Sequence, residues 1–395
     1  MTFDSDRAQM ERLLGPPDDI GSDSLRWFDA RLRGGDAPMP PMAGAYDPRR
    51  HEEILYHHDA ASGLRAIVTV HSTALGPSLG GTRWHPYPDA GAALQDVLRL
   101  SAAMTAKSAL AGLDLGGGKA AVIGNPAERT PAQLAAYARL IDGLEGRYIT
   151  TTDVGTTTAD IDVLSELTRY VVGASPARGG SGDTSALTSE TVMLGMRAAL
   201  RVAFGDESLE GSRVVVVGVG KVGSRVARAC AQHGASVGVA DVRRDEAERL
   251  AAEIGADVLD AGTAYAERCD VLSPNALGGV LNEGSIPELR CRVICGAANN
   301  QLLRDPEDAA LIAGRGILYA PDYVVSAGGV INVAVELGGY SEDRARAIAS
   351  RVHPTTRELL EMSQELGIST AEAALRRVED RIATARVAGS TSPTA

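Results

Sequence analysis

The chain has 395 residues, of which 44% are hydrophobic and 23% are charged, and its formal net charge is −12. This length predicts about two domains with a sizeable core. An acidic chain without a dense run of Lys and Arg is a poor candidate for binding nucleic acid. No apolar run approaches the roughly 20 residues that span a bilayer, and residues 1–15 carry acids where a signal peptide is apolar. We therefore expect a cytoplasmic protein that makes no membrane contact.

Four cysteines are the first candidates for special chemistry: Cys230, Cys269, Cys291 and Cys295. Cys291 and Cys295 lie four residues apart, but a zinc site uses about four ligands and no histidine lies near them in the sequence. The seven histidines form no HExxH pattern. We expect buried thiols and no metal site.

Residues 1–48 differ in composition from the rest, because two stretches in them are rich in Pro, Gly and Asp. Such composition predicts a poorly structured extension, with at most one short helix over 25–32. Trp27 and Phe28 in that segment suggest that it docks elsewhere, for example on another subunit.

The first folded block is predicted over 49–180, as a mixture of strands and amphipathic helices. Thr130 and the proline after it predict a helix N-terminus. The strands are expected over 52–58, 64–72, 119–124 and 147–151, and the helices over 89–109 and 130–144.

The second block is predicted over 181–340, after a Gly/Ser/Thr-rich connection. Its strands alternate with helices, which predicts a parallel, doubly wound α/β sheet. Residues 341–386 are predicted to form amphipathic helices that pack back between the domains, and 387–395 to form a tail.

A glycine turn follows the first strand of this block. Gly218, Gly220 and Gly223 match G-x-G-x-x-G, with Val222 inside the motif, and they open a predicted helix. The first glycine permits the tight turn, the second lets the backbone approach a pyrophosphate, and the third allows helix and strand to pack closely. The free N–H groups of the helix N-terminus favour phosphate. This context predicts a dinucleotide site.

Asp241 ends the next predicted strand, about 20 residues after the glycines. A carboxylate there accepts hydrogen bonds from a ribose diol and repels a 2′-phosphate, which favours NAD over NADP. Arg243 and Arg244 follow closely and weaken this preference. The alternative is that the glycines only form a tight turn and that Asp241 caps the next helix.

A second glycine-rich stretch, 116–118, directly precedes Lys119. A phosphate-binding P-loop would need glycine where Leu113 stands and a hydroxyl where Ala120 stands, and it would lead into a helix instead of a strand. The phosphate interpretation therefore fails. We expect these glycines to clear space for a ligand beside Lys119.

Two further polar residues stand at the ends of predicted elements. Lys107 lies at the end of a helix and Asp153 just after a strand, where functional groups are often carried. Taken singly, Lys107 could neutralise helix carbonyls, Asp153 could be a turn residue and Lys119 could face solvent.

Several long stretches decide between these alternatives, and they occur in a fixed order: 76–83, 104–126, 146–155, 296–302 and 320–332. Through them the chain from about 49 to 385 resembles the amino-acid dehydrogenases that act on glutamate, leucine, phenylalanine and valine, and is most similar to valine and leucine dehydrogenases. The resemblance implies two α/β domains, an N-terminal substrate and oligomerisation domain and a Rossmann-type NAD-binding domain. It also implies a homo-oligomer.

The resemblance implies roles for individual residues. Lys119 would be the catalytic lysine and Asp153 the acid/base partner of the substrate amino group, while Lys107 and Asn300 would hold the substrate carboxylate. A lysine acts as a base only when its pKa is lowered, so we expect burial and Lys107 to lower that of Lys119. The backbone of Gly80 and Gly81, and a side-chain pocket, would complete the substrate site. The pocket residues would be Leu79, Met104, Thr151, Val330 and Val333, and the nicotinamide ribose would lie near Thr188 and Asn299.

Three positions depart from the family pattern: Ser326 stands where asparagine is usual, Val335 where an acid is expected, and Asn275 where cysteine is common. The leading hypothesis is reversible, NAD-dependent oxidative deamination of a branched-chain L-amino acid. The alternatives are a dehydrogenase retuned to another amino or imino acid, and a catalytically weakened NAD-binding regulatory protein.

Overall fold

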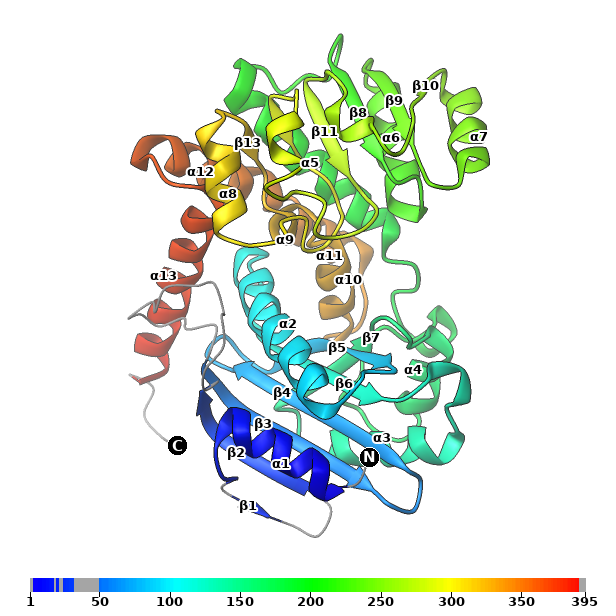
Figure 1. The fold of residues 1–395 in the computed structure, drawn as a ribbon, viewed down its shortest axis with the longest axis vertical. Helices are drawn as coiled ribbons and strands as arrows, with labels where there is room; N and C mark the ends of the chain where they lie inside the picture. Colours follow the sequence, from blue (N-terminus) through cyan, green and yellow to red (C-terminus); the bar gives the residue numbers. More distant parts are fainter. Residues whose placement is uncertain (1–2, 18, 21–23, 32–49, 391–395) are drawn as a thin grey trace.

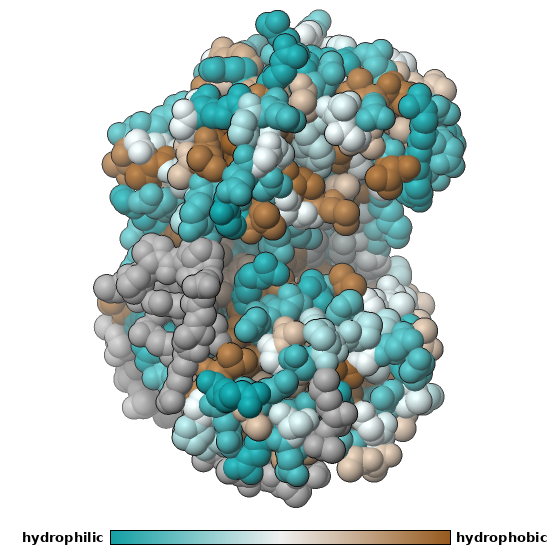
Figure 2. All heavy atoms as spheres, viewed as in Figure 1, coloured by the Kyte–Doolittle hydropathy of each residue, from teal (hydrophilic) through white to brown (hydrophobic). Residues whose placement is uncertain are grey.

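The computed structural model describes residues 3–17, 19–20, 24–31 and 50–390, which form two α/β domains. The first domain lies at the bottom of Figure 1 and the second at the top, and helices of the C-terminal region lie along both. The molecule narrows to a waist where the domains meet, and hydrophilic residues cover much of the face in Figure 2.

The first domain is built on a seven-stranded mixed sheet with the order β1-β2-β3-β4-β6-β5-β7. β5 runs parallel to both of its neighbours, and the other pairs are antiparallel. The strands are β1 (Asp19–Ile20), β2 (Ser24–Arg31), β3 (Arg50–Asp59), β4 (Leu64–Ser72), β5 (Ser78–His85), β6 (Gly116–Ile123) and β7 (Tyr148–Thr152).

Helices cover both faces of this sheet, because successive strand residues point to opposite sides. Ile54 and Tyr56 of β3 pack with α1 (Phe3–Leu14) and α2 (Ala90–Leu110), whereas Leu55 packs with α3 (Pro131–Asp142) and α4 (Thr158–Ser165). Thr130 caps α3 in a capping box with Gln133, as its sequence predicts. α2 rises from the sheet towards the second domain (Figure 1).

The N-terminal extension corrects our prediction where the structure describes it. The helix expected over 25–32 is wrong, because this segment pairs with β3 as strand β2. Leu25 and Trp27 are buried while Phe28 is exposed, which is the period-two alternation of a strand covered on one face. Pro- and Gly-rich flanks hid this pattern in the sequence. Residues 32–49 lie outside the described part of the chain.

α1 belongs to the same packed unit, so the described part of 1–48 is not poorly structured. Met10 and Leu14 are buried in a core cluster with α2. Asp6 is fully buried, and its carboxylate accepts a hydrogen bond from Tyr56 and forms an ion pair with Arg65 at 2.7 Å. The extension therefore covers the β3 edge of the sheet and packs beside α2.

The glycines at 116–118 form the first half of β6. A Cβ atom on Gly116 would lie 1.8 Å from the Ser72 carbonyl oxygen, and one on Gly117 would lie 2.1 Å from the Thr105 nitrogen of α2. A Cβ atom on Gly118 would lie 2.6 Å from the Tyr148 ring. Protein atoms thus fill the space beside all three glycines, and the expectation that they clear room for a ligand is wrong. They let α2 and β4 approach β6 closely.

The second domain is a six-stranded, all-parallel sheet with the order β10-β9-β8-β11-β12-β13, which confirms the doubly wound prediction. Its strands are β8 (Arg213–Val217), β9 (Ser236–Ala240), β10 (Asp257–Val258), β11 (Val271–Pro274), β12 (Val293–Ile294) and β13 (Leu318–Tyr319). Its helices are α5 (Ser185–Phe204), α6 (Lys221–Gln232), α7 (Arg244–Ile254), α8 (Glu307–Gly314) and α9 (Asp322–Val325). The strand order reverses between β8 and β11, where such sheets bind dinucleotides.

The last helices join the domains. α12 packs on α5 of the second domain, and α13 packs on α2 of the first. One core cluster accordingly contains Leu79, Ala109, Leu359 and Ile382. α13 continues to Ser390, past the predicted boundary at 386. These helices are α10 (Gly328–Glu336), α11 (Glu342–Ala349), α12 (Val352–Leu366) and α13 (Thr370–Ser390), and 3-10 turns lie at Pro126–Glu128, Pro176–Arg178, Ala264–Ala266 and Ile286–Glu288.

The four cysteines are free and buried, as predicted. No group of three His, Cys, Asp or Glu side chains placed to hold a metal ion occurs among the described residues. In the same part of the chain, no helix is long and apolar enough to cross a membrane.

Candidate active site

Lys119 and Asp153 meet across strand β5 in the first domain. Lys119 lies on β6 and Asp153 directly follows β7, with β5 between the two strands. The Lys119 ammonium nitrogen donates to Asp153 Oδ2. Gly81 of β5 makes the approach possible, because a Cβ atom there would lie 2.9 Å from the Asp153 Cβ atom. The two predicted catalytic groups therefore form one pair.

The environment of Lys119 is unusual for a lysine, because the residue is only 5% exposed. Burial lowers its pKa to about 7, and the positive charges of Arg83 and Lys107 act in the same direction, while Asp96 opposes them. This confirms the predicted direction and its causes. A lysine with such a pKa is partly neutral at physiological pH and can accept a proton.

Lys107, near the end of α2, reaches the second domain. Its Nζ donates to Asn299 Oδ1 at 3.3 Å, in the turn that follows β12. Burial lowers the pKa of Lys107, and the charge of Asp322 opposes this effect. The resemblance assigns the carboxylate to Lys107 and Asn300, whereas the structure places Asn299 against Lys107.

A buried carboxylate holds the turn at 299–300. Asn300 has a left-handed backbone with φ +53°, which is uncommon outside glycine. Its N–H donates to Asp322 Oδ2 at 2.8 Å, and the Tyr319 hydroxyl donates to Asp322 Oδ1 at 2.7 Å. Asp322 thereby fixes the turn that faces Lys107, a role that was not predicted from the sequence.

The predicted pocket residues come together in one apolar cluster. Leu79, Val330 and Val333 are buried in it, and Met104 packs against it. Thr151 lies at its edge: a Cβ atom on Gly173 would lie 2.6 Å from Thr151 Oγ1 and 3.7 Å from Val333 Cγ1. Gly80, also predicted, lies against β6, where a Cβ atom would lie 1.8 Å from the Gly118 carbonyl oxygen.

The glycine turn of the second domain has the geometry that a dinucleotide needs. Gly218 has φ +94°, and a Cβ atom on Gly223 would lie 1.9 Å from the Gly218 carbonyl oxygen. By contrast, no atom lies within 4 Å of a Cβ atom built on Gly220. α6 begins after Gly220 without a side-chain cap, and Val222 is its second residue. The open approach and the uncapped N–H groups fit a pyrophosphate.

Asp241 follows β9, as predicted. Its carboxylate accepts hydrogen bonds from the backbone N–H of Val219 at 2.8 Å and of Arg243 at 2.9 Å. Burial alone would raise the pKa of Asp241, but these two amides and the Arg243 charge lower it. Asp241 thus orders the glycine turn, and it lies two residues before Arg243, the N-cap of α7. Thr188 lies on α5, and its hydroxyl donates to the Thr184 carbonyl at 2.9 Å.

Comparison with known proteins identifies the family. Residues 51–170 match the family model described as Glu/Leu/Phe/Val dehydrogenase, dimerisation domain, and residues 239–389 match Glutamate/Leucine/Phenylalanine/Valine dehydrogenase. The chain belongs to the Glu/Leu/Phe/Val dehydrogenase family. Residues 177–278 also match the NAD-binding domain of D-isomer specific 2-hydroxyacid dehydrogenases.

Individual relatives of this Glu/Leu/Phe/Val dehydrogenase cover most of its length. A leucine dehydrogenase from Geobacillus stearothermophilus is 45% identical, over 86% of this chain and 93% of its own. A valine dehydrogenase from Streptomyces coelicolor is 46% identical, over 86% and 94%. In the crystal structure of L-tryptophan dehydrogenase from Nostoc punctiforme, 40% identical, the match covers 85% of this chain and 97% of that chain with a TM-score of 0.78.

The three departures from the family pattern have different surroundings. Ser326 is 5% exposed, and its hydroxyl has no hydrogen-bond partner among the described residues. Val335 is buried in the apolar core between the domains. Asn275 is structural, since its amide donates to the Ser273 carbonyl and accepts from the Ala297 N–H at 3.0 Å.

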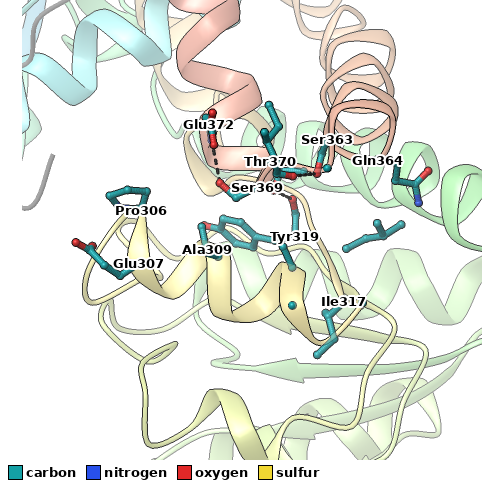
Figure 3. A pocket seen from close by; sticks show the side chains of 17 residues that line it. Pro306, Glu307, Ala309, Ile317, Tyr319, Ser363, Gln364, Ser369, Thr370 and Glu372 are labelled. Carbon is teal, nitrogen blue, oxygen red and sulfur yellow. Dashed lines mark hydrogen bonds between the residues drawn. The ribbon is translucent and has the colours of Figure 1, made fainter. Parts of the chain in front are cut away.

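Two charged residues beside the Lys119–Asp153 pair, Arg83 and Asp96, were also missed. Arg83 ends one of the family-like stretches, 76–83, and Asp96 lies eleven residues before Lys107, about three helical turns. The position of Arg83 and the helical spacing of Asp96 from Lys107 could both have been noticed in the sequence. A cavity of about 780 Å³ lies elsewhere, between α8 and the α12–α13 corner, where Tyr319 and Thr370 point into it (Figure 3). None of the predicted site residues lines it.

Proposed function

We propose that this Glu/Leu/Phe/Val dehydrogenase catalyses the reversible, NAD-dependent oxidative deamination of a branched-chain L-amino acid to the 2-oxo acid and ammonia. The observation that carries the proposal is the buried Lys119–Asp153 pair, with Lys107 nearby. The identity of about 45% to proteins named leucine and valine dehydrogenase supports the branched-chain class.

Lys107 is proposed to bind the substrate carboxylate. It lies at the junction of the two domains, where Asn299 already accepts a hydrogen bond from it and Asn300 stands next in the chain. A carboxylate between the ammonium and these amides gains charge-assisted hydrogen bonds. The apolar cluster of Leu79, Val330 and Val333 suits a branched aliphatic side chain.

Asp153 and Lys119 are proposed to move protons during the reaction. The Asp153 carboxylate takes a proton from the substrate ammonium, which frees the nitrogen lone pair. NAD⁺, held at the glycine turn of the second domain, would supply the acceptor for the hydride of Cα. Neutral Lys119 removes a proton from the water that attacks the resulting iminium carbon. Asp153 then returns its proton to the amino nitrogen of the carbinolamine, and the carboxylate so regenerated takes the hydroxyl proton as the C–N bond breaks and ammonia leaves. General acid–base groups of this kind contribute about 10²–10⁴-fold each.

The second domain is proposed to hold NAD at the glycine turn. Gly220 leaves its approach open, and the N-terminus of α6 presents free N–H groups to the pyrophosphate. The ionised carboxylate of Asp241 would accept hydrogen bonds from the ribose hydroxyl groups. The other proposed contacts are Gly218, Val222, Gly223, Thr188 and Asn299.

We infer that the chain acts as a homo-oligomer. The family model that matches residues 51–170 is described as a dimerisation domain. Light scattering on the purified protein at several concentrations measures the number of subunits. A monomer at every concentration would contradict the inference.

A second candidate is a related dehydrogenase retuned to another amino acid. The similarity to a tryptophan dehydrogenase supports it, and so does the Thr151 hydroxyl, which has no hydrogen-bond partner within the described residues. A polar atom in an otherwise apolar pocket favours a substrate that can hydrogen-bond to it.

The appearance of NADH with a panel of L-amino acids tests both candidates. We expect the highest kcat/KM with leucine, isoleucine or valine, and lower values with phenylalanine, tryptophan and glutamate. A clear preference for tryptophan or phenylalanine would favour the second candidate. Tight NAD binding without turnover of any amino acid would overturn the enzymatic proposal.

A further inference from the structure

We propose that Arg83, held in place by Asp96, is a positioning residue that fixes the Asp153 carboxylate against Lys119. This inference rests on the proposed function, because it assigns a role in the same reaction. Neither residue needs to touch the substrate for this role.

The geometry places Asp153 between two cations. Arg83 Nη2 lies 3.6 Å from Asp153 Oδ1, while Lys119 contacts Oδ2 of the same carboxylate. The Val154 N–H also donates to Oδ1, at 2.5 Å. The side chains of Arg83 and Asp153 are only 24% and 16% exposed, so solvent screens their attraction weakly. Each carboxylate oxygen therefore has a fixed partner.

Asp96 in turn holds Arg83. Its Oδ2 accepts hydrogen bonds from Arg83 Nη1 at 2.7 Å and from the Tyr87 hydroxyl at 2.6 Å. Arg99 lies 3.5 Å from the other oxygen but is 70% exposed, so it contributes little. The Asp96 carboxylate thereby directs the Arg83 guanidinium towards Asp153.

Helix α2 carries both Asp96, which holds Arg83, and Lys107, the lysine proposed to bind the substrate carboxylate. Asp96 and Lys107 are eleven residues apart on this helix, which places them on nearly the same side, about 16 Å apart along the axis. A helix is stiff over three turns, so one rigid element sets the positions of Arg83 and Lys107 relative to the sheet.

Charged and titratable side chains from several elements surround Lys119. Arg83 of β5 and Lys107 of α2 lower its pKa, while Asp96 of α2 raises it. Asp153 follows β7, and His71 of β4 is hydrogen-bonded to Thr105. Loss of Arg83 and loss of Asp96 are therefore expected to shift the protonation of Lys119 in opposite directions, which a general loss of structure would not do.

The test compares Arg83→Gln, Asp96→Asn and the double variant through the pH dependence of kcat/KM for amino-acid oxidation. We expect the acidic limb of Arg83→Gln to move up by about one pH unit, because a nearby cation is lost. The limb of Asp96→Asn should move down, and the double variant should return close to the wild type. In all three, kcat should fall about tenfold or more, because Asp153 is no longer fixed.

Arg83→Lys separates charge from position. It keeps the cation but loses the planar fork that spans Asp96 and Asp153. We expect its acidic limb to stay near that of the wild type while kcat falls. Thermal unfolding and NAD affinity, measured on every variant, should stay near wild-type values. The proposal would be overturned if the acidic limb of the pH profile stayed in place in Arg83→Gln and Asp96→Asn. It would also be overturned if Arg83→Lys kept the wild-type kcat.

A second readout does not depend on turnover. The sequence has three lysines, Lys107, Lys119 and Lys221, so the labelling of each by dinitrofluorobenzene can be followed by mass spectrometry across pH. The labelling midpoint of Lys119 should move up in Arg83→Gln and down in Asp96→Asn, while exposed Lys221 should not move. If the wild type oxidises no amino acid but these midpoints shift, the proposed function fails and the positioning role stands. Unchanged Lys119 midpoints would overturn the role itself.

Discussion

Lys107 and Asn299, 192 residues apart in the chain, meet at 3.3 Å and join the two domains near the Lys119–Asp153 pair. Lys107 lies on α2, which is anchored in the first domain, and Asn299 lies in the turn that follows β12 of the second domain. The geometry that we assign to substrate binding therefore exists only when the domains are closed on one another.

Replacing Lys107 tests the role of this junction in binding the substrate. We expect Lys107→Met to raise KM for the amino acid about 10- to 100-fold, because a hydrogen bond to a charged group contributes about 1.5–3 kcal/mol. Steady-state kinetics and NAD titration measure the effect. The affinity for NAD should stay within about threefold, and an unchanged KM would remove Lys107 from the substrate site.

Two glycines of the second domain should respond differently to alanine. The methyl group of Gly220→Ala would have no protein atom within 4 Å, so thermal stability should stay at the wild-type value. The same methyl group should obstruct the pyrophosphate. We expect NAD affinity, measured by calorimetry, to fall at least about tenfold, or about 1.4 kcal/mol. Gly223→Ala is the matched control, because its methyl group collides with the Gly218 carbonyl oxygen and should lower stability as well. Wild-type NAD affinity in Gly220→Ala would contradict the assigned site.

The N-terminal extension is expected to contribute to stability. Trp27 is 2% exposed and its indole N–H donates to the Gly15 carbonyl at 2.9 Å. Trp27→Ala should lower the free energy of unfolding by about 3 kcal/mol or more, as measured in urea. Phe28→Ala, at an exposed neighbour, should cost less than about 1 kcal/mol. Equal effects of the two substitutions would show that β2 is not packed as described.

Glu336 at the end of α10 is expected to fix the connection between the domains. Its carboxylate accepts hydrogen bonds from the N–H groups of Gly173 and Ser181, both at 2.7 Å. Glu336→Gln can satisfy only one of them with oxygen, so we expect a loss of about 1–3 kcal/mol in the free energy of unfolding. Glu342→Gln, on the exposed face of α11, is the control and should change it by less than about 0.5 kcal/mol.

The doubly wound domain was predictable because its signals are local. The strand over 213–217, the glycine turn and Asp241 form one continuous pattern, and the parallel order follows from alternation of strands and helices. The strand at 24–31 was not predictable in the same way. It exists because the edge of β3 is available for pairing, which is a long-range condition.

The active site was predictable in its members but not in all of its contacts. Lys119 and Asp153 were named from the sequence, and the structure brings them together. That Lys107 faces Asn299 depends on how two domains close, which no local pattern encodes. The same is true of Gly116 and Gly117, whose neighbours include Ser72 of β4 and Thr105 of α2.

The measurement that tests the central claim most directly is the pH dependence of kcat/KM in the wild type and in Lys119→Arg. Below about pH 7 Lys119 is protonated and cannot take a proton from water, so the wild-type rate of deamination should fall as the pH drops through this value. Arginine stays protonated, so above pH 7 the variant should lose about 10²-fold or more of the wild-type rate, and it should show no limb near pH 7. A Lys119→Arg enzyme that keeps the wild-type rate and the same limb would contradict the account.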